Sequence, residues 1–261
     1  MAYQNRPSSN LALESSAPQI MVLLIIGLVN HWSGQSLTPQ IKGRDMLQPY
    51  DSAQSQDIAY RSLVGSPVID FAARSTKGEV RLSAFSGRWI LLFCHPADFT
   101  PVCTSEFVAL AQEQDKFAEM GVQLLGLSVD SVYSHMGWIE WIETKFNLSV
   151  NFPVIEDVSM DIARAYGMID AYSDTTSTVR ACLFIDPAQK VQALIHYPMH
   201  IGRSVDELLR VQRALIDTYQ TAKVAPANWC PGDDFMQSAA DSVSGGTKGW
   251  LQRVMLPIDK S

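Results

Sequence analysis

Short apolar runs alternate with longer amphipathic segments from Pro67 onward, and this pattern predicts strands that alternate with helices. The clearest run is WILLFCH, residues 89–95, which is apolar up to its last residue. Strands of this kind lie at the centre of α/β sheets, where both faces are covered. A second apolar run, VQLLGLSVD at residues 122–130, predicts a neighbouring strand. The alternation therefore predicts an α/β fold around a buried sheet.

Two helices are predicted beside these strands. Residues 105–120 place apolar side chains at helical spacing. Residues 131–146 have the same spacing and predict a second helix. Its Trp138, Trp141 and Ile142 are assigned to one face, an aromatic stripe that is more often core packing than a cofactor site.

The second half of the domain begins with two further apolar runs. TVRACLFID at residues 178–186 and VQALIHYP at residues 191–198 are separated by a short turn, which predicts an antiparallel pair. Ser204 then has the character of a helix N-cap, with Glu207 three residues later completing a capping box. The helix is expected to continue to Tyr219.

The chain divides into three parts by composition. Residues 1–61 are rich in Ser, Gln and Asn and form a leader expected to be disordered or partly apolar. Its apolar segment, residues 20–29, is shorter than the roughly 20 residues needed to cross a bilayer; it has the length of a signal-peptide core but not its flanks. Residues 62–222 are expected to form the main domain and residues 223–261 a C-terminal extension. We expect a cytoplasmic protein, with anchoring or export through residues 20–29 as the alternative.

Charge and cysteine content exclude several classes of protein. The net charge is −7 and no run of Lys or Arg occurs, which argues against a nucleic-acid partner. The four cysteines lie too far apart for a C-x-x-C motif or a paired zinc site. Cys94 and Cys182 are interpreted as small buried hydrophobic residues. We therefore expect a protein of a reducing compartment with one reactive thiol.

The stretch HPADFTPVCTSEF, which starts at His95, joins the first apolar strand to the first helix. The helix is expected to begin within one or two residues of Cys103, whose sulfur then lies near unpaired N–H groups and the positive end of the helix dipole. Both favour the thiolate. Thr100 offers a hydroxyl beside the sulfur, and Pro96 restricts the chain where it leaves the strand. Arg180, inside an apolar strand, is the best candidate for a positive partner; its alternative is a strand-edge arginine facing solvent.

These residues resemble a known family. PADFTPVC fits the P-x-x-x-[TS]-x-x-C signature of the peroxiredoxins, and the chain is most similar to the one-cysteine, peroxiredoxin-6-like (AhpC/TSA) branch. The resemblance covers roughly residues 62–258 and implies a thioredoxin-like α/β fold with a mixed central sheet and a C-terminal extension. The other stretches that match in order are LLGLSVDSVYSHMGWI (124–139), TVRACLFID (178–186), HYPMHIGRSVDELLRVQRAL (196–215) and PANWCPGDD (226–234).

The resemblance implies a thiol-dependent peroxidase that acts on hydrogen peroxide and small organic hydroperoxides. Cys103 would be the peroxidatic cysteine, which attacks a peroxide oxygen and becomes a sulfenic acid. Thr100 and Arg180 would hydrogen-bond the peroxide oxygens, and Pro96 would shield the sulfenate. Donors on a rigid frame suffice for this chemistry, so neither a metal nor an organic cofactor is expected.

Three further residues have supporting positions by the same resemblance. Glu106 and Arg203 stand where the family has secondary residues of the active-site network. His95 either lines the pocket or is satisfied by packing at the strand end. Expected partners are the peroxide, an external thiol reductant of thioredoxin, glutaredoxin or glutathione type, and a second copy of the chain in a homodimer or ring of dimers.

The sequence departs from two-cysteine relatives near the end of the domain. Ala225 occupies the place of their resolving cysteine, which favours a one-cysteine cycle. The resemblance implies that residues 223–261 serve as a dimer arm. Cys230, directly after Trp229, is either an inert thiol or a resolving cysteine that reaches the partner's active site through this arm. A phospholipase site found in some relatives is not predicted, because no histidine occupies the matching positions.

Two other classes of function compete with the peroxidase. A cysteine hydrolase would need a histidine base, for which His196 and His200 are available, but it leaves Thr100 and Pro96 unexplained. A non-catalytic binding or holdase protein could retain the same frame. The joint presence of Cys103, Thr100 and Arg180 argues against that second alternative.

Overall fold

The computed structural model describes residues 62–169 and 176–238. The predicted leader, residues 1–61 with its apolar segment 20–29, lies outside the described residues, as does the end of the chain from residue 239. Within the described part of the chain, no helix has both the length and the apolar character needed to span a membrane.

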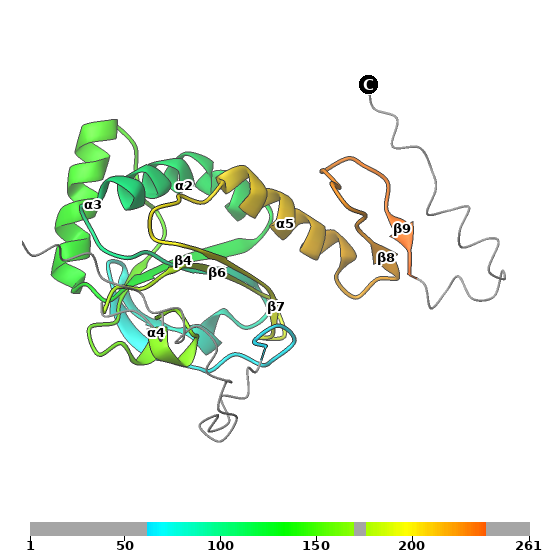
Figure 1. Cartoon of the computed structure of the whole chain (residues 1–261), viewed down its shortest axis with the longest axis horizontal. Coiled ribbons are helices and arrows are strands. Elements are labelled where there is room, and N and C mark those ends of the chain that lie inside the picture. The colour runs from blue at the N-terminus through cyan, green and yellow to red at the C-terminus, as the bar shows by residue number, and fades with distance from the viewer. Residues whose placement is uncertain (1–61, 170–175, 239–261) are drawn as a thin grey trace, which may run out of the picture. The chain divides into compact units, whose positions relative to one another are not determined.

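A seven-stranded sheet forms the centre of the domain (Figure 1). Its strands in chain order are β1 (Ala72–Ser75), β2 (Gly78–Arg81), β3 (Trp89–Cys94), β4 (Val122–Ser128), β5 (Val154–Glu156), β6 (Arg180–Ile185) and β7 (Val191–Tyr197). Across the sheet the order is β2-β1-β5-β4-β3-β6-β7. Strands β3, β4 and β5 are parallel to one another, whereas all other neighbours are antiparallel. The sheet is therefore mixed, and the predicted α/β class is confirmed.

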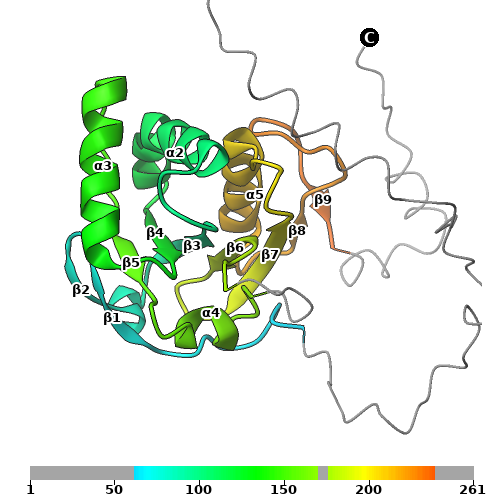
Figure 2. The ribbon, with the colours of Figure 1, turned by 60° about the vertical axis from the view of Figure 1, so that its left-hand side comes forward.

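Helices cover both faces of the sheet. They are α2 (Pro101–Glu119), α3 (Val132–Phe146), α4 (Asp161–Ala165) and α5 (Val205–Thr218), with a short 3-10 turn, η1 (Leu82–Phe85), after β2. Figures 1 and 2 show α2, α3 and α5 on one face and α4 on the other.

The unbroken apolar sequence of β3 follows from the helices on both faces of the sheet. Leu91 and Phe93 point into the core beneath α2, α3 and α5, whereas Ile90, Leu92 and Cys94 point into the core shared with α4. All six residues of the strand are buried. A strand covered on both faces needs no polar alternation, which explains the continuous apolar run in the sequence.

Helix α2 begins earlier than predicted. The expected start at residue 105 is wrong, because Pro101 occupies the first helical position and Thr100 is the N-cap in an extended conformation. Proline suits this position, since its fixed φ is helical and it has no N–H that needs an acceptor. Cys103 consequently lies inside the first turn of the helix.

The face assigned to α3 needs one correction. Trp138 and Ile142, four residues apart, are buried as predicted, but Trp141 is 45% exposed. A step of one residue turns the chain by about 100°, so Trp141 and Ile142 cannot share the middle of one face. Trp141 instead lies near Phe146 at the surface, with ring centroids 6.1 Å apart.

Only half of the capping box of α5 is formed. The Ser204 side chain accepts a hydrogen bond from the Glu207 backbone N–H, as predicted. The Glu207 carboxylate pairs with Arg210 one turn later, at 2.6 Å. The Glu207 carboxylate therefore binds the Arg210 guanidinium and not the Ser204 backbone N–H, as a full capping box would require.

The described part of the C-terminal extension packs onto α5. It contains a two-stranded ribbon of β8 (Lys223–Val224) and β9 (Met236–Gln237), where an extended tail was expected. Trp229 between these strands is buried, and its carbonyl oxygen accepts a hydrogen bond from Arg210 at 3.0 Å.

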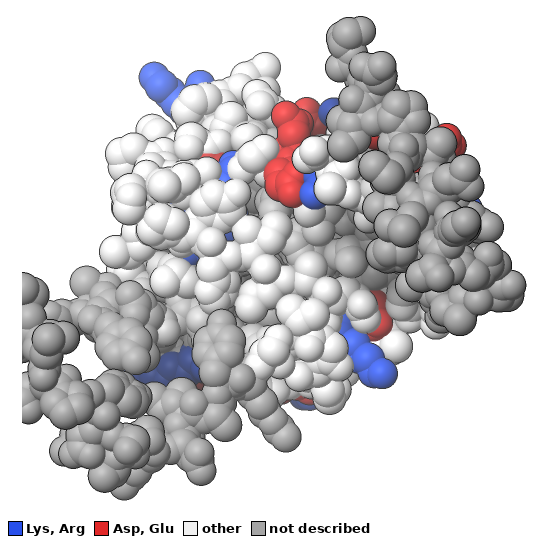
Figure 3. Space-filling model, turned by 45° about the vertical axis from the view of Figure 1, so that its right-hand side comes forward, with Lys and Arg blue, Asp and Glu red and all other residues white. Residues whose placement is uncertain are grey.

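Charged side chains are distributed without large basic areas on the face that Figure 3 shows. Acidic side chains gather near its upper centre, whereas the described Lys and Arg side chains lie singly or beside them. This face therefore lacks, among the described residues, the continuous basic surface that nucleic acids require.

Candidate active site

The Cys103 thiol is enclosed at the start of α2. The residue is 0% exposed, and its sulfur accepts a hydrogen bond from Arg180 Nη1 at 3.4 Å. In the first turn of an α-helix the N–H groups have no acceptor within the helix and carry a partial positive charge. Two sources of positive potential, the helix and the guanidinium, therefore act on the same sulfur.

Arg180 is held in place from two sides. It begins β6, is 2% exposed, and its Nε and Nη2 atoms donate to the Met199 carbonyl oxygen at 2.9 and 2.6 Å. The same Nη1 that contacts Cys103 also donates to Glu106 Oε2 at 2.6 Å. The alternative of a solvent-facing strand-edge arginine is therefore excluded.

Glu106 joins Arg180 to a second arginine. Arg203 donates to Glu106 through its backbone N–H, Nε and Nη2 at 2.7, 2.8 and 2.8 Å. Burial alone would raise the pKa of Glu106, but the hydrogen bonds and charge of Arg203, together with the charge of Arg180, hold it below its usual value. The carboxylate is therefore ionised at neutral pH.

The charges in this buried network do not cancel. Arg180 and Arg203 contribute two positive charges, and Glu106 contributes one negative charge, so the three side chains carry one surplus positive charge. All three are at most 7% exposed. This surplus charge faces the Cys103 sulfur through Arg180, and an uncompensated buried charge is costly, so the site favours a negatively charged group beside Arg180.

Thr100 and Pro96 lie on the loop between β3 and α2. The Thr100 hydroxyl donates to the Ala97 carbonyl oxygen at 2.9 Å, which leaves its oxygen free to accept a hydrogen bond. Pro96 is buried. The structure thus links Cys103, Arg180, Glu106 and Arg203 through successive hydrogen bonds, and it places Thr100 three residues before Cys103 at the N-cap of α2.

Comparison with known proteins identifies this arrangement. The model of the AhpC/TSA family matches residues 64–194, which is half of the chain. Peroxiredoxin 2 of Thermoplasma acidophilum is 44% identical over 185 residues, covering 71% of this chain and 92% of the relative. The chain belongs to the AhpC/TSA family. It is a peroxiredoxin, a thiol-dependent peroxidase.

Solved structures agree with this assignment. A cysteine-to-serine mutant of peroxiredoxin 6 of Arenicola marina is 34% identical, with a TM-score of 0.64 over 69% of this chain and 87% of the other. A yeast mitochondrial 1-Cys peroxiredoxin is 38% identical, with a TM-score of 0.62 over 66% of this chain and 84% of the other. The fold is thioredoxin-like, as predicted, and the alternative of a non-catalytic binding protein is not favoured.

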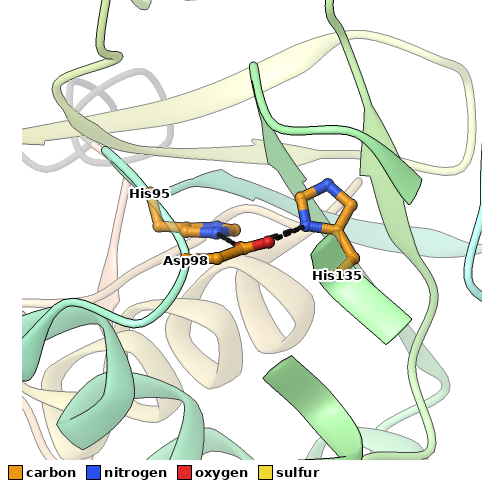
Figure 4. A group of neighbouring side chains, drawn as sticks. All are labelled: His95, Asp98 and His135. Carbon is orange, nitrogen blue, oxygen red and sulfur yellow. Dashed lines mark hydrogen bonds and ion pairs between the residues drawn. The ribbon is translucent and has the colours of Figure 1, made fainter. Parts of the chain in front are cut away.

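His95 belongs to a second buried cluster that the sequence pattern did not reveal (Figure 4). Its Nε2 lies 2.8 Å from Asp98 Oδ1, and His135 Nδ1 lies 2.9 Å from Asp98 Oδ2. Both histidines are 0% exposed. His135 stands four residues after Ser131 on the same face of α3 as Trp138 and Ile142. A polar residue on that apolar face was the available signal.

The remaining cysteines of the peroxiredoxin differ in environment. Burial raises the pKa of Cys94 to about 11, and it also raises the pKa of Cys182. Both are buried, in agreement with their predicted role as hydrophobic residues. Cys182 also contacts the site network, because Arg203 Nη1 lies 3.4 Å from its sulfur.

Cys230 is exposed and lies away from the Cys103 end of α2. It lines a surface groove of about 920 Å³ together with Lys116 and Met120 from the C-terminal part of that helix. At a rise of about 1.5 Å per residue, Lys116 stands about 20 Å along the helix from Cys103. A disulfide requires Cα atoms within roughly 7 Å, so the described arm would have to leave this groove to form one within a chain.

Proposed function

We propose that Cys103 is the peroxidatic cysteine and that Arg180 and Thr100 bind the peroxide. The observation that carries this proposal is the 3.4 Å contact between Arg180 Nη1 and the Cys103 sulfur inside a network with a surplus positive charge. Arg180 can donate a hydrogen bond to a peroxide oxygen, and the Thr100 hydroxyl oxygen can accept a hydrogen bond from the peroxide O–H. Pro96 limits access of water to the sulfur.

The chemical step transfers two electrons from sulfur to oxygen. The Cys103 thiolate attacks the terminal oxygen of the hydroperoxide, an S–O bond forms, and the O–O bond breaks. The leaving hydroxide or alkoxide takes up from solvent the one proton that the thiol released when it ionised and departs as water or alcohol, while Cys103 remains as sulfenic acid. Arg180 and the first-turn N–H groups stabilise the negative charge that builds up on the leaving oxygen.

We further propose a one-cysteine cycle. An external thiol attacks the sulfenic acid, releases water and leaves a mixed disulfide, which a second thiol reduces. The position of Cys230 beside the far half of α2 supports an external reductant of thioredoxin, glutaredoxin or glutathione type. In the yeast mitochondrial 1-Cys peroxiredoxin, thiol resolution proceeds via glutathione and thioredoxin systems. Continued exposure to peroxide oxidises the waiting sulfenate to sulfinic or sulfonic acid.

We also propose that the protein is a cytoplasmic homodimer or a ring of dimers. Strand β7 is an edge strand with one neighbour, β6, and most of its residues are only half-buried, which supports a homodimer through paired edge strands or a ring of such dimers. We place the protein in the cytoplasm, where thiol reductants are abundant. Anchoring or export through residues 20–29 stays the alternative.

The test is stopped-flow tryptophan fluorescence of the reduced full chain mixed with hydrogen peroxide, followed by intact-mass analysis. We expect rapid oxidation in wild type and in Cys230→Ser, with sulfenic or higher acids as products, and loss of the rapid phase in Cys103→Ser. A wild-type rate no faster than that of an ordinary free thiol contradicts the peroxidatic assignment. A Cys103–Cys230 disulfide in the products contradicts the one-cysteine cycle alone.

A further inference from the structure

Asp98 occupies the middle of the loop that carries the peroxide-binding residues. The loop leaves β3 at His95 and reaches the N-cap Thr100, two residues after Asp98. Asp98 is only 7% exposed, and its carboxylate points inward between His95 and His135 (Figure 4). One side chain thus connects the catalytic loop to α3.

The hydrogen-bond partners determine where the protons lie. His135 Nε2 lies 3.2 Å from the Ile155 carbonyl oxygen, which can only accept, so this nitrogen carries a proton. His135 Nδ1 faces both oxygens of Asp98, at 3.0 and 2.9 Å. An ionised carboxylate also only accepts, so this nitrogen carries a second proton. His135 and Asp98 therefore form a buried ion pair.

Hydrogen bonds join Asp98 to both His95 and His135. Two histidines and a carboxylate are also a common ligand set for zinc. Here, however, the contacts of 2.8 to 3.0 Å are hydrogen-bond lengths that need protons between the atoms. His95 completes the set as a neutral donor: its Nε2 faces Asp98, whereas its buried Nδ1 has no hydrogen-bond partner among the described residues.

The backbone of the loop needs such an anchor. Phe99, between Asp98 and Thr100, has a φ of 57°, a left-handed conformation that is unfavourable for a phenylalanine. Its ring is 58% exposed and gives the loop little burial. Asp98 is fixed at both ends, because its backbone N–H donates to Asp130 Oδ2 at 2.9 Å while its carboxylate pairs with His135.

We propose that Asp98 and His135 are positioning residues of the peroxidase reaction. Their ion pair holds the loop so that Thr100 keeps its place at the N-cap of α2, one turn before Cys103, and it thereby ties the geometry of the site to α3. This inference rests on the proposed roles of Cys103 and Thr100. Neither Asp98 nor His135 touches the peroxide; both act through the loop.

Removing the ion pair should affect peroxide and other electrophiles differently. Peroxide must be oriented in line with the sulfur, and a misplacement of about 1 Å costs on the order of a hundredfold in rate. Iodoacetamide needs only access to the thiolate, and Cys103 becomes more accessible when the loop opens. The ratio of the two rate constants therefore reports loop position, and a variant that loses stability elsewhere in the domain shows how much of any change comes from stability alone.

The test measures this ratio for Cys103 in the full chain. Stopped-flow fluorescence gives the peroxide rate constant, and peptide mass spectrometry gives the rate of Cys103 labelling by iodoacetamide. We expect Asp98→Asn and His135→Gln each to lower the ratio at least roughly tenfold. We expect the double variant to lower it no further than the stronger single variant, because the two residues act as one unit.

Asp157→Asn is the matched control. Asp157 is also a buried aspartate, 4% exposed, but its carboxylate accepts from backbone N–H groups at the start of α4. This variant should lose stability and keep the wild-type ratio. A wild-type ratio in both Asp98→Asn and His135→Gln, or full additivity in the double variant, overturns the inference while the peroxidatic role of Cys103 stands. Slow oxidation of the wild type overturns the proposed function itself.

Discussion

Arg180 Nη1 lies 3.4 Å from the sulfur of Cys103, although the two residues are 77 positions apart in the chain. Strand β6 brings the arginine to the sheet position beside β3, and the start of α2 brings the cysteine above it. The Met199 carbonyl oxygen and the Glu106 carboxylate hold the guanidinium at this distance. The contact between Arg180 and Cys103 therefore depends on the way β6, β3 and α2 pack together, and no single loop contains both residues.

Arg180→Lys should slow oxidation of Cys103 by hydrogen peroxide roughly a hundredfold. One ammonium group cannot reach Cys103, Glu106 and the Met199 carbonyl oxygen together, whereas the planar guanidinium does so. The second-order rate constant from stopped-flow fluorescence measures the effect. Arg81→Lys is the control, because Arg81 is an exposed residue paired with Asp70. Equal rates in the two variants would refute the role of the guanidinium fork.

Glu106→Gln should lower the free energy of unfolding by about 3 to 5 kcal/mol, because it leaves two buried guanidinium groups without their shared carboxylate. Urea denaturation followed by circular dichroism measures the change. Glu113→Gln on the same helix removes a carboxylate that pairs with the exposed Lys116, and it should cost less than about 1 kcal/mol. Similar small losses in both variants would show that the buried network contributes no special stability.

Because His95 is buried, we expect the free energy of unfolding to decrease as the pH falls from about 7 to about 5. Burial lowers its pKa in the folded protein, against the opposing effect of Asp98. The unfolded state binds a proton near pH 6.5, whereas the folded state does not, so acid favours unfolding by up to about 1.4 kcal/mol per pH unit. Asp98 and Glu106 have lowered pKa values, so their contribution is lost only at more acidic pH.

The pH dependence can be measured from thermal or urea unfolding across this range. His95→Gln should show a shallower decline than wild type. His200→Gln replaces an exposed histidine and should keep the wild-type decline. The explanation fails when His95→Gln retains the full slope.

Thiol labelling should separate the cysteines by environment. Because the pKa of Cys94 is about 11, only about one molecule in a thousand is thiolate at about pH 8, and the sulfur is also buried. Iodoacetamide should therefore label exposed Cys230 at least a hundredfold faster than Cys94 or Cys182 in the native protein. Peptide mass spectrometry measures the rates, and labelling in urea, where all four should react alike, is the control. Native labelling of Cys94 at the rate of Cys230 would disprove this burial effect.

Much of the fold was predictable from local patterns. The apolar run at residues 89–95 became β3, and the run at residues 122–130 became β4. Burial on both faces explains such runs, because few polar side chains are tolerated where a strand is covered on both sides. The predicted start of α2 at residue 105 is four residues late, because Pro101 takes the first helical position.

The sequence by itself determined the candidate for the reactive group: a cysteine at a helix start after an apolar strand, with Thr100 ahead of it and Arg180 in a distant strand. Only the tertiary structure decided which charges surround that cysteine. Glu106 and Arg203 lie 97 positions apart, and Asp98 and His135 lie 37 apart, yet each pair shares hydrogen bonds in the core. Local patterns record whether a residue is buried and in which element. They do not record which buried polar groups meet, because that depends on how helices pack against the sheet.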